Sequence, residues 1–254
     1  MNKLTDELEK DILSSLHSEI GGLLTGPSAP APVDRPRTPA PPPPPARTSA
    51  APVQAPPVSH QPSSTLAQSR AIESDQRERR VAHRLGKEFD KLPVNMRNEL
   101  IKTLARTDDV KVREDVVIAV ASNFGKLPPE VQSLLRTLAA DQDSRVRDEV
   151  AFELNRNFQK IPPNFRSEIL EQLARDVDIT VREDIIAAIA GHYNEDSERM
   201  RALLRLLASD RKASVRDQVA IELKRNQDII PGDQRAELER VIEKTAAEES
   251  RGQV

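Results

Sequence analysis

The sequence predicts an all-α protein: a right-handed α-solenoid of about five two-helix repeats, preceded by an isolated amphipathic helix and a disordered proline-rich linker. The first observation is a repeated phrase. Val-Arg pairs begin at Val112, Val146, Val181 and Val215, with offsets of 34, 35 and 34 residues, and a fixed period of this size indicates stacked repeats. The other two observations are compositional. Only six of the 254 residues are aromatic, which suits layers of helices with aliphatic cores, and 14 of the 20 prolines lie between residues 27 and 62.

Residues 1–25 are expected to form the isolated amphipathic helix. Apolar residues recur every four positions and form one stripe, at Leu4, Leu8, Ile12, Leu16 and Ile20. A single helix with one apolar face is unstable alone. The segment is therefore predicted to dock in a groove, with Leu8, Ile12, Leu16 and Ile20 as anchors. Its charged residues are mostly acidic, which disfavours binding to anionic lipid.

Residues 26–69 form the predicted linker. This segment is rich in Pro and Ala and includes five consecutive prolines. Such a composition favours polyproline II structure and cannot form a packed core. If the linker is extended at ~3.1 Å per residue, it can span up to roughly 140 Å. The N-terminal helix could thus reach a second protein, its own repeat array or a neighbouring copy.

Residues 70–245 form the predicted repeat array, and residues 246–254 a polar C-terminal tail. The second helix of each repeat carries the Val-Arg phrase, and Val146, Val150 and Leu154 recur one turn apart on its expected core face. The recurring pattern D-x-x-x-x-V-R-x-x-V/A-x-x-A/E-L resembles the HEAT-repeat family of α-solenoids. The unit is shorter than in long HEAT repeats, and Val or Ile replaces a usual Ala, as in compact bacterial HEAT-like proteins.

Three charged rows recur in the array. They are the arginines Arg113, Arg147, Arg182 and Arg216, the aspartates Asp109, Asp143 and Asp178, and a further row of Asp141, Asp176 and Asp210. The resemblance to HEAT repeats implies that the first two rows hold the turn between helices and link adjacent repeats by charge-assisted hydrogen bonds. The third row is expected to bond the turn backbone. We interpret all three as structural.

Two further columns are also interpreted as structural. Asn123, Asn157 and Asn226 end the second helices, and since Asn tolerates the left-handed conformation it predicts a cap there. The aromatic column is Phe89, Phe124, Phe158 and Tyr193. It is expected to pack between repeats rather than to stack on nucleic-acid bases.

The positions that differ between repeats are the candidate binding residues. One stripe of the second helix is expected to face the concave surface and to contact a protein partner. It comprises Asp115, Ala119 and Ser122, then Glu149, Glu153 and Arg156, then Asp184, Ala188 and Gly191, then Gln218, Glu222 and Arg225. Large charged and small residues alternate from repeat to repeat, which predicts two shallow grooves between charged ridges and an ancestral two-repeat block. The alternative is that the Glu and Arg residues are ordinary i,i+3 pairs worth roughly 0.2–0.5 kcal/mol each.

The composition disfavours several other functions. The chain has no Cys, only eight Gly and no phosphate-binding loop, and its four His lie in unrelated contexts. We therefore expect no catalytic residues, no metal site and no cofactor, although HEAT-like enzymes exist. Few aromatic residues and the acidic pairs that open each second helix make nucleic acid an unlikely ligand. The acidic N-terminus has no long apolar run, so we expect neither a signal peptide nor a membrane span, and a cytoplasmic location.

The sequence favours a non-enzymatic scaffold or adaptor. In this hypothesis the solenoid binds one protein partner while the tethered N-terminal helix docks a second, so that the linker raises their effective concentration. The first alternative is self-association, in which the N-terminal helix occupies its own groove or that of a neighbour. The second alternative is a HEAT-like protein that binds nucleic acid, which predicts a steep salt dependence.

Overall fold

The computed structural model describes residues 63–252, and this part of the chain is helical throughout, without strands. The predicted N-terminal helix over residues 1–25 and most of the predicted linker lie outside the described residues. In chain order the α-helices are α2 (Ser63–Lys87), α3 (Val94–Leu104), α4 (Val110–Ser122), α5 (Pro129–Gln132), α6 (Leu134–Ala139), α7 (Ser144–Arg156), α8 (Pro163–Leu173), α9 (Ile179–Gly191), α10 (Ser197–Ala208), α11 (Ala213–Arg225) and α12 (Gly232–Gly252). Four short 3₁₀ turns follow α2, α4, α7 and α9: η1 (Phe89–Lys91), η2 (Phe124–Lys126), η3 (Phe158–Lys160) and η4 (Tyr193–Glu195).

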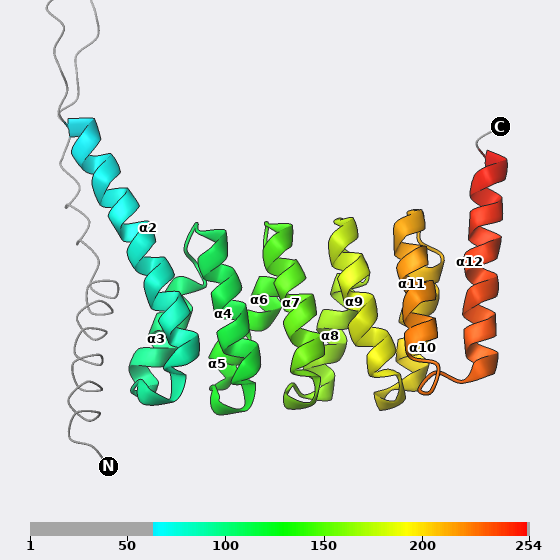
Figure 1. Cartoon of the computed structure of the whole chain (residues 1–254). Helices are drawn as coiled ribbons and strands as arrows, with labels where there is room; N and C mark the ends of the chain where they lie inside the picture. Colours follow the sequence, from blue (N-terminus) through cyan, green and yellow to red (C-terminus); the bar gives the residue numbers. More distant parts are fainter. Residues whose placement is uncertain (1–62, 253–254) are drawn as a thin grey trace, which may run out of the picture.

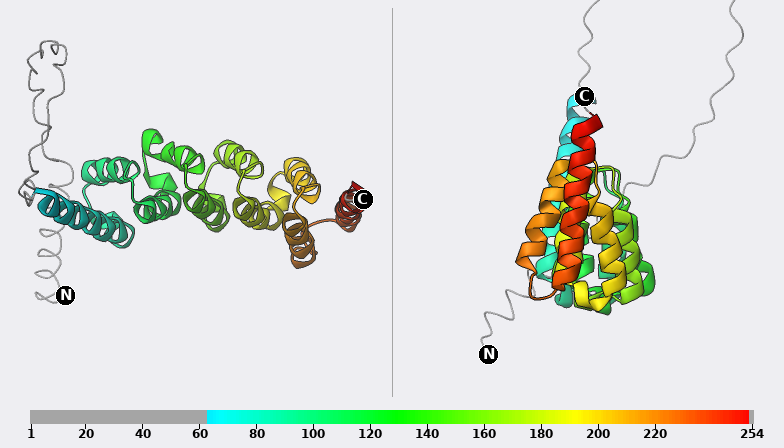
Figure 2. Two further views of the ribbon diagram at one scale, coloured as in Figure 1. Left: turned by 90° about the horizontal axis from the view of Figure 1, so that it is seen from above. Right: turned by 90° about the vertical axis from the view of Figure 1, so that its right-hand side faces the viewer.

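The helices form two layers of roughly antiparallel neighbours (Figure 1). We call α2, α4, α7, α9 and α11 layer B, in which each helix contacts the next, and α3, α5, α6, α8 and α10 layer A. The view from above in Figure 2 shows the two layers as two rows of helices. The long α12 contacts α10 and α11 and stands at the C-terminal end of the array.

Local sequence explains where most helices begin and end. Asp109, Asp143 and Asp178 precede α4, α7 and α9, and each carboxylate accepts a hydrogen bond from the backbone N–H two residues later, which is a standard N-cap. Proline opens α5 and α8, where its fixed φ suits the first helical turn.

The Asn caps form differently from the prediction. Asn123, Asn157 and Asn226 have φ between −115° and −105°, and no residue other than Gly in the described range has a positive φ. The left-handed cap is therefore wrong. Instead, each Asn side-chain amide donates to the carbonyl oxygen four residues earlier, at 2.9–3.2 Å, and a 3₁₀ turn or a tight bend continues the chain.

The core lies between the two layers. Along α7, Val146, Val150 and Leu154 are fully buried, and the equivalent residues of α4, α9 and α11 are buried in the same way, so the predicted core face is confirmed. The aromatic column Phe89, Phe124, Phe158 and Tyr193 is also buried. These side chains lie in the 3₁₀ turns that follow α2, α4, α7 and α9, one in each successive repeat.

Two boundaries differ from those expected. Helix α2 begins at Ser63, within the predicted linker, and α12 continues to Gly252, through most of the predicted polar tail. These helices flank the array and contain long polar stretches. Composition alone therefore assigns part of each helix to the linker or to the tail.

Candidate partner-binding face

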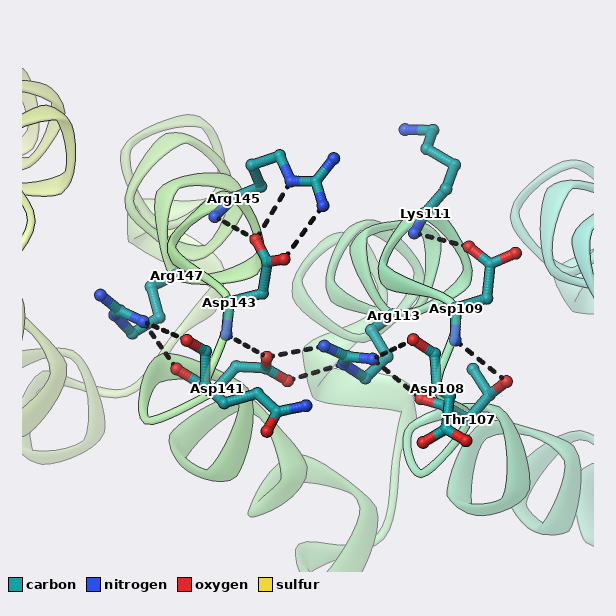
Figure 3. A network of polar contacts seen from close by, with 10 residues as sticks. Thr107, Asp108, Asp109, Lys111, Arg113, Asp141, Asp143, Arg145 and Arg147 are labelled. Carbon is teal, nitrogen blue, oxygen red and sulfur yellow. Dashed lines mark hydrogen bonds and ion pairs between the residues drawn. The ribbon is translucent and has the colours of Figure 1, made fainter.

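The arginine row joins successive repeats through the third aspartate row. Arg113 donates two hydrogen bonds to Asp141 of the next repeat, at 2.7 and 2.8 Å, and two more to the carbonyl oxygens of Thr107 and Asp108 (Figure 3). Arg147 donates from Nε and Nη2 to Asp176, both at 2.7 Å. Arg182 donates in the same way to Asp210, at 2.8 and 3.1 Å. The last member, Arg216, meets Glu249 of α12 at 2.8 Å.

The structure separates the roles of the two aspartate rows. Asp109, Asp143 and Asp178 cap layer B helices, whereas Asp141, Asp176 and Asp210 receive the arginines of the preceding repeat. The third row also accepts hydrogen bonds from the backbone N–H two residues later, at 2.8–2.9 Å, which confirms its predicted role in the turn. In the first repeat Asp109 also receives an arginine, Arg79 of α2. Because each guanidinium satisfies a carboxylate and the turn carbonyls together, these residues hold the array in register and leave no free group for a ligand.

Most of the predicted binding stripe lies at the surface, but its middle positions do not. Glu153 is 1% exposed and Glu222 is 2% exposed, and Ala119 and Ala188 are buried as well. Their assignment as exposed partner-binding positions is wrong. These positions face the neighbouring layer B helix, because each helix of this layer is packed on both flanks.

Packing explains why the repeats alternate. The buried Glu153 accepts a hydrogen bond from Asn157 at 2.7 Å, and Glu222 accepts from Asn226 at 3.0 Å and from Arg225 at 2.6 Å. Ser122, on the adjacent helix, lies 3.5 Å from the Glu153 carboxylate. The two buried Glu alternate with the two Ala along the layer, so that a large side chain is always placed next to small ones. The two-repeat pattern therefore reflects interior volume, and the shallow grooves predicted from it do not form at these positions.

The surface that layer B does expose consists of three rows across α4, α7, α9 and α11, which we call the outer face. The acidic row is Asp115, Glu149, Asp184 and Gln218; the apolar row is Ile118, Phe152, Ala187 and Ile221; the third row is Ser122, Arg156, Gly191 and Arg225. All twelve residues are partly or fully exposed. The acidic and third rows belong to the predicted stripe.

The apolar row is the part of this face that the sequence prediction missed. Phe152 is 57% exposed and Ile221 is 49% exposed, among few large apolar side chains at the described surface. Phe152 was identifiable as an aromatic residue outside the buried aromatic column. The prediction chose the position four residues after Glu149, whereas the solvent-facing position is three residues after it.

Negative charge is incompletely balanced on the outer face. Arg156 and Arg225 pair with the buried Glu153 and Glu222, at 3.6 and 2.6 Å. Lys111 pairs with Glu114 and Asp115, at 2.9 and 3.5 Å. In the described residues, no Lys or Arg nitrogen lies within 4.0 Å of the carboxylates of Glu149 or Asp184. The centre of the face is thus acidic.

The carboxyl pKa values reflect this excess charge. Burial and then the neighbouring Glu153 raise the pKa of Glu149 above its usual range, and burial raises the pKa of Asp115 against the opposing effect of Lys111. Asp148 has the largest change: burial, a hydrogen bond with Asp184 and repulsion from that carboxylate raise its pKa to about 7. Among the described residues no donor group reaches Asp148 Oδ1. Asp148, between α7 and α9, therefore exchanges its proton near neutral pH.

Comparisons with known proteins do not assign the chain to a family. No family model matches the chain, and no curated protein matches it. One solved structure, an engineered protein from the Northeast Structural Genomics Consortium, is similar to this chain with a TM-score of 0.38 and 17% sequence identity. The alignment covers 68% of this chain and 91% of the engineered protein. No helix within residues 63–252 carries an apolar stretch long enough to cross a membrane.

Proposed function

We propose that the chain is a HEAT-like α-solenoid that acts as a non-enzymatic adaptor between two proteins. The outer face of layer B holds one partner, and residues 1–25 dock a second at the end of the Pro-rich linker. The observation that carries the proposal is the exposed apolar row, with Phe152 at its centre. A large aromatic side chain that is more than half exposed is typical of a protein interface, where aromatic residues are the usual anchors.

The Arg–Asp ladder supports the architectural half of the proposal. The same bridge recurs between successive repeats at Arg113, Arg147 and Arg182, so the array is held as one stiff element. A stiff array keeps the four helices of the outer face in fixed positions, which lowers the entropy that binding would otherwise cost.

Nucleic acid fits the outer face poorly. Glu149 and Asp184 lie at its centre without a basic partner within the described residues, and they repel phosphate groups. A protein partner therefore suits the chemistry better than a polyanion.

The test is a comparison of partners captured by the full-length chain and by two variants. Ile12→Asp with Leu16→Asp changes the N-terminal stripe, and Phe152→Ser with Ile221→Ser changes the apolar row. Nuclease-treated extracts of the native host are passed over each bait, and bound proteins are identified by mass spectrometry.

An adaptor loses one partner in the first variant and a different partner in the second. The proposal is refuted if both variants retain every partner, or if no protein is captured while a labelled oligonucleotide binds the chain with an affinity that falls steeply with salt. Loss of self-association in either variant, seen by analytical ultracentrifugation, would replace the adaptor with the self-association alternative.

A further inference from the structure

The apolar row has the length of a helix. It crosses four neighbouring helices, α4, α7, α9 and α11, each of which contacts the next. Packed helices lie 8–10 Å apart, so the row extends over about 30 Å. A helix of about 20 residues has the same length, at 1.5 Å per residue. An extended or globular partner would need only part of the row.

The row also has relief along its length. Phe152 on α7 and Ile221 on α11 are large and exposed, whereas α9 between them presents only Ala187, with Gly191 one turn on. Two large apolar side chains therefore flank α9, whose exposed residues in this part of the face are small. A large apolar side chain of a partner can lie over α9 between them, as an anchor residue of a helix does in a groove.

The charges beside the row favour a partner with basic side chains. Three basic residues beside the row, Lys111, Arg156 and Arg225, pair with carboxylates of this chain. Glu149 and Asp184 have no such partner within the described part of the chain. A cationic side chain placed beside either carboxylate is attracted to it, whereas an anionic one is repelled.

We infer that the outer face binds an amphipathic helix of another protein, about 20 residues long, whose apolar stripe is flanked by Lys or Arg. This inference rests on the proposed function and narrows the partner of the layer B site. The chain's own N-terminal segment is the less suitable occupant because residues 1–25 carry five acidic and two basic residues, so the charge beside its stripe has the wrong sign.

The test uses the full-length chain and three fluorescein-labelled peptides, each about 20 residues long. The first has Leu at positions i, i+3, i+4 and i+7 and Lys on the flanks. The second replaces every Lys by Glu, and the third keeps the Lys but replaces every Leu by Ser. Fluorescence anisotropy at 0.15 M salt measures the dissociation constants. We expect the Lys–Leu peptide to bind at least tenfold more tightly than either of the other two.

Variants then locate the binding site. Phe152→Ser is expected to weaken binding of the Lys–Leu peptide at least tenfold, and Glu149→Gln with Asp184→Asn by a similar factor. Val177→Ser is the matched control, because Val177 is the most exposed large apolar residue described, at 91%, and lies outside the outer face. This control is expected to leave the dissociation constant unchanged.

Other outcomes would overturn the inference. Equal binding of the Glu–Leu peptide refutes the basic partner, and equal binding of the Lys–Ser peptide shows attraction by charge alone. If Ile12→Asp with Leu16→Asp tightens peptide binding severalfold, the chain's own N-terminal segment occupies the face. If Phe152→Ser converts a dimer to a monomer in sedimentation, the occupant is a second copy. Each result leaves the capture experiment free to support or refute the adaptor separately, since that experiment does not depend on the charge of the partner.

Discussion

Replacing Asp148 by Asn is expected to stabilise the protein by an amount that grows as the pH rises from about 4 to about 7. Asp148 lies between α7 and α9 with Asp184 beside it, and its pKa is raised from 3.8 to about 7. The folded protein therefore binds one proton more than the unfolded chain between these two values. Stability falls as the pH rises through this window, and above about pH 7 the full penalty applies.

The magnitude follows from the same pKa values. A change from 3.8 to about 7 corresponds to roughly 4 kcal/mol. Asp148 is only half-buried, so solvent screening reduces this to about 2 kcal/mol. At pH 4.5 the penalty falls to about 0.5 kcal/mol, because this pH is only slightly above the ordinary pKa of 3.8. Asn cannot ionise and has nearly the same shape, so it removes the penalty.

The assay is thermal unfolding followed by circular dichroism at pH 4.5 and pH 8.0. For a helical array of this size, about 2 kcal/mol corresponds to a rise in Tm of roughly 4–8 °C. We expect this rise at pH 8.0 and about a quarter of it, roughly 1–2 °C, at pH 4.5. The matched control is Asp217→Asn, which changes the equivalent but exposed residue of α11 and should leave Tm unchanged at both values.

Two results would refute this reasoning. A rise in Tm that is equal at both pH values would mean that Asn improves packing and that no proton is involved. A rise of similar size in Asp217→Asn would mean that net charge, rather than the pair between α7 and α9, sets the effect.

The remaining predictions concern the ladder, the layer B interior and the outer face. Arg147→Ala leaves Asp176 buried without its partner and should lower the free energy of unfolding in urea by about 3–5 kcal/mol, while Lys244→Ala, in an exposed pair, should change it by less than about 0.5 kcal/mol; equal losses would contradict a structural ladder. Ala188→Glu overfills a buried position and should cost about 3 kcal/mol or more, measured by Tm; an unchanged Tm would exclude the volume explanation of the two-repeat pattern. Phe152→Ser should leave Tm within about 1 °C of the parent, since Phe152 is exposed; a large drop would place this residue in the fold.

Features that depend on short stretches of chain were predictable. The period of the Val-Arg phrase, the buried Val and Leu residues one turn apart, and the Asp before each layer B helix all follow from local geometry. The helical class follows too, because 34- or 35-residue repeats with few aromatic residues have few other ways to bury their apolar side chains. The left-handed Asn cap failed since a side-chain hydrogen bond to the previous turn stabilised another conformation.

The partition of roles among repeated charges was beyond local reasoning. Asp141 and Asp143 are two residues apart, and either could cap a helix or receive an arginine. Only the stacking of repeats places Arg113 against Asp141, since that contact joins residues 28 positions apart.

By itself, the sequence determined the repeat, the helical class and the core side of each helix, because these depend on spacings within one or two turns. Only the tertiary structure decided which flank of each layer B helix meets solvent. Phe152 and Glu153, three and four positions after Glu149, lie about 100° apart around α7. The neighbouring layer B helix covers Glu153 and leaves Phe152 exposed. The candidate binding face therefore depends on how neighbouring helices pack, which no single repeat contains.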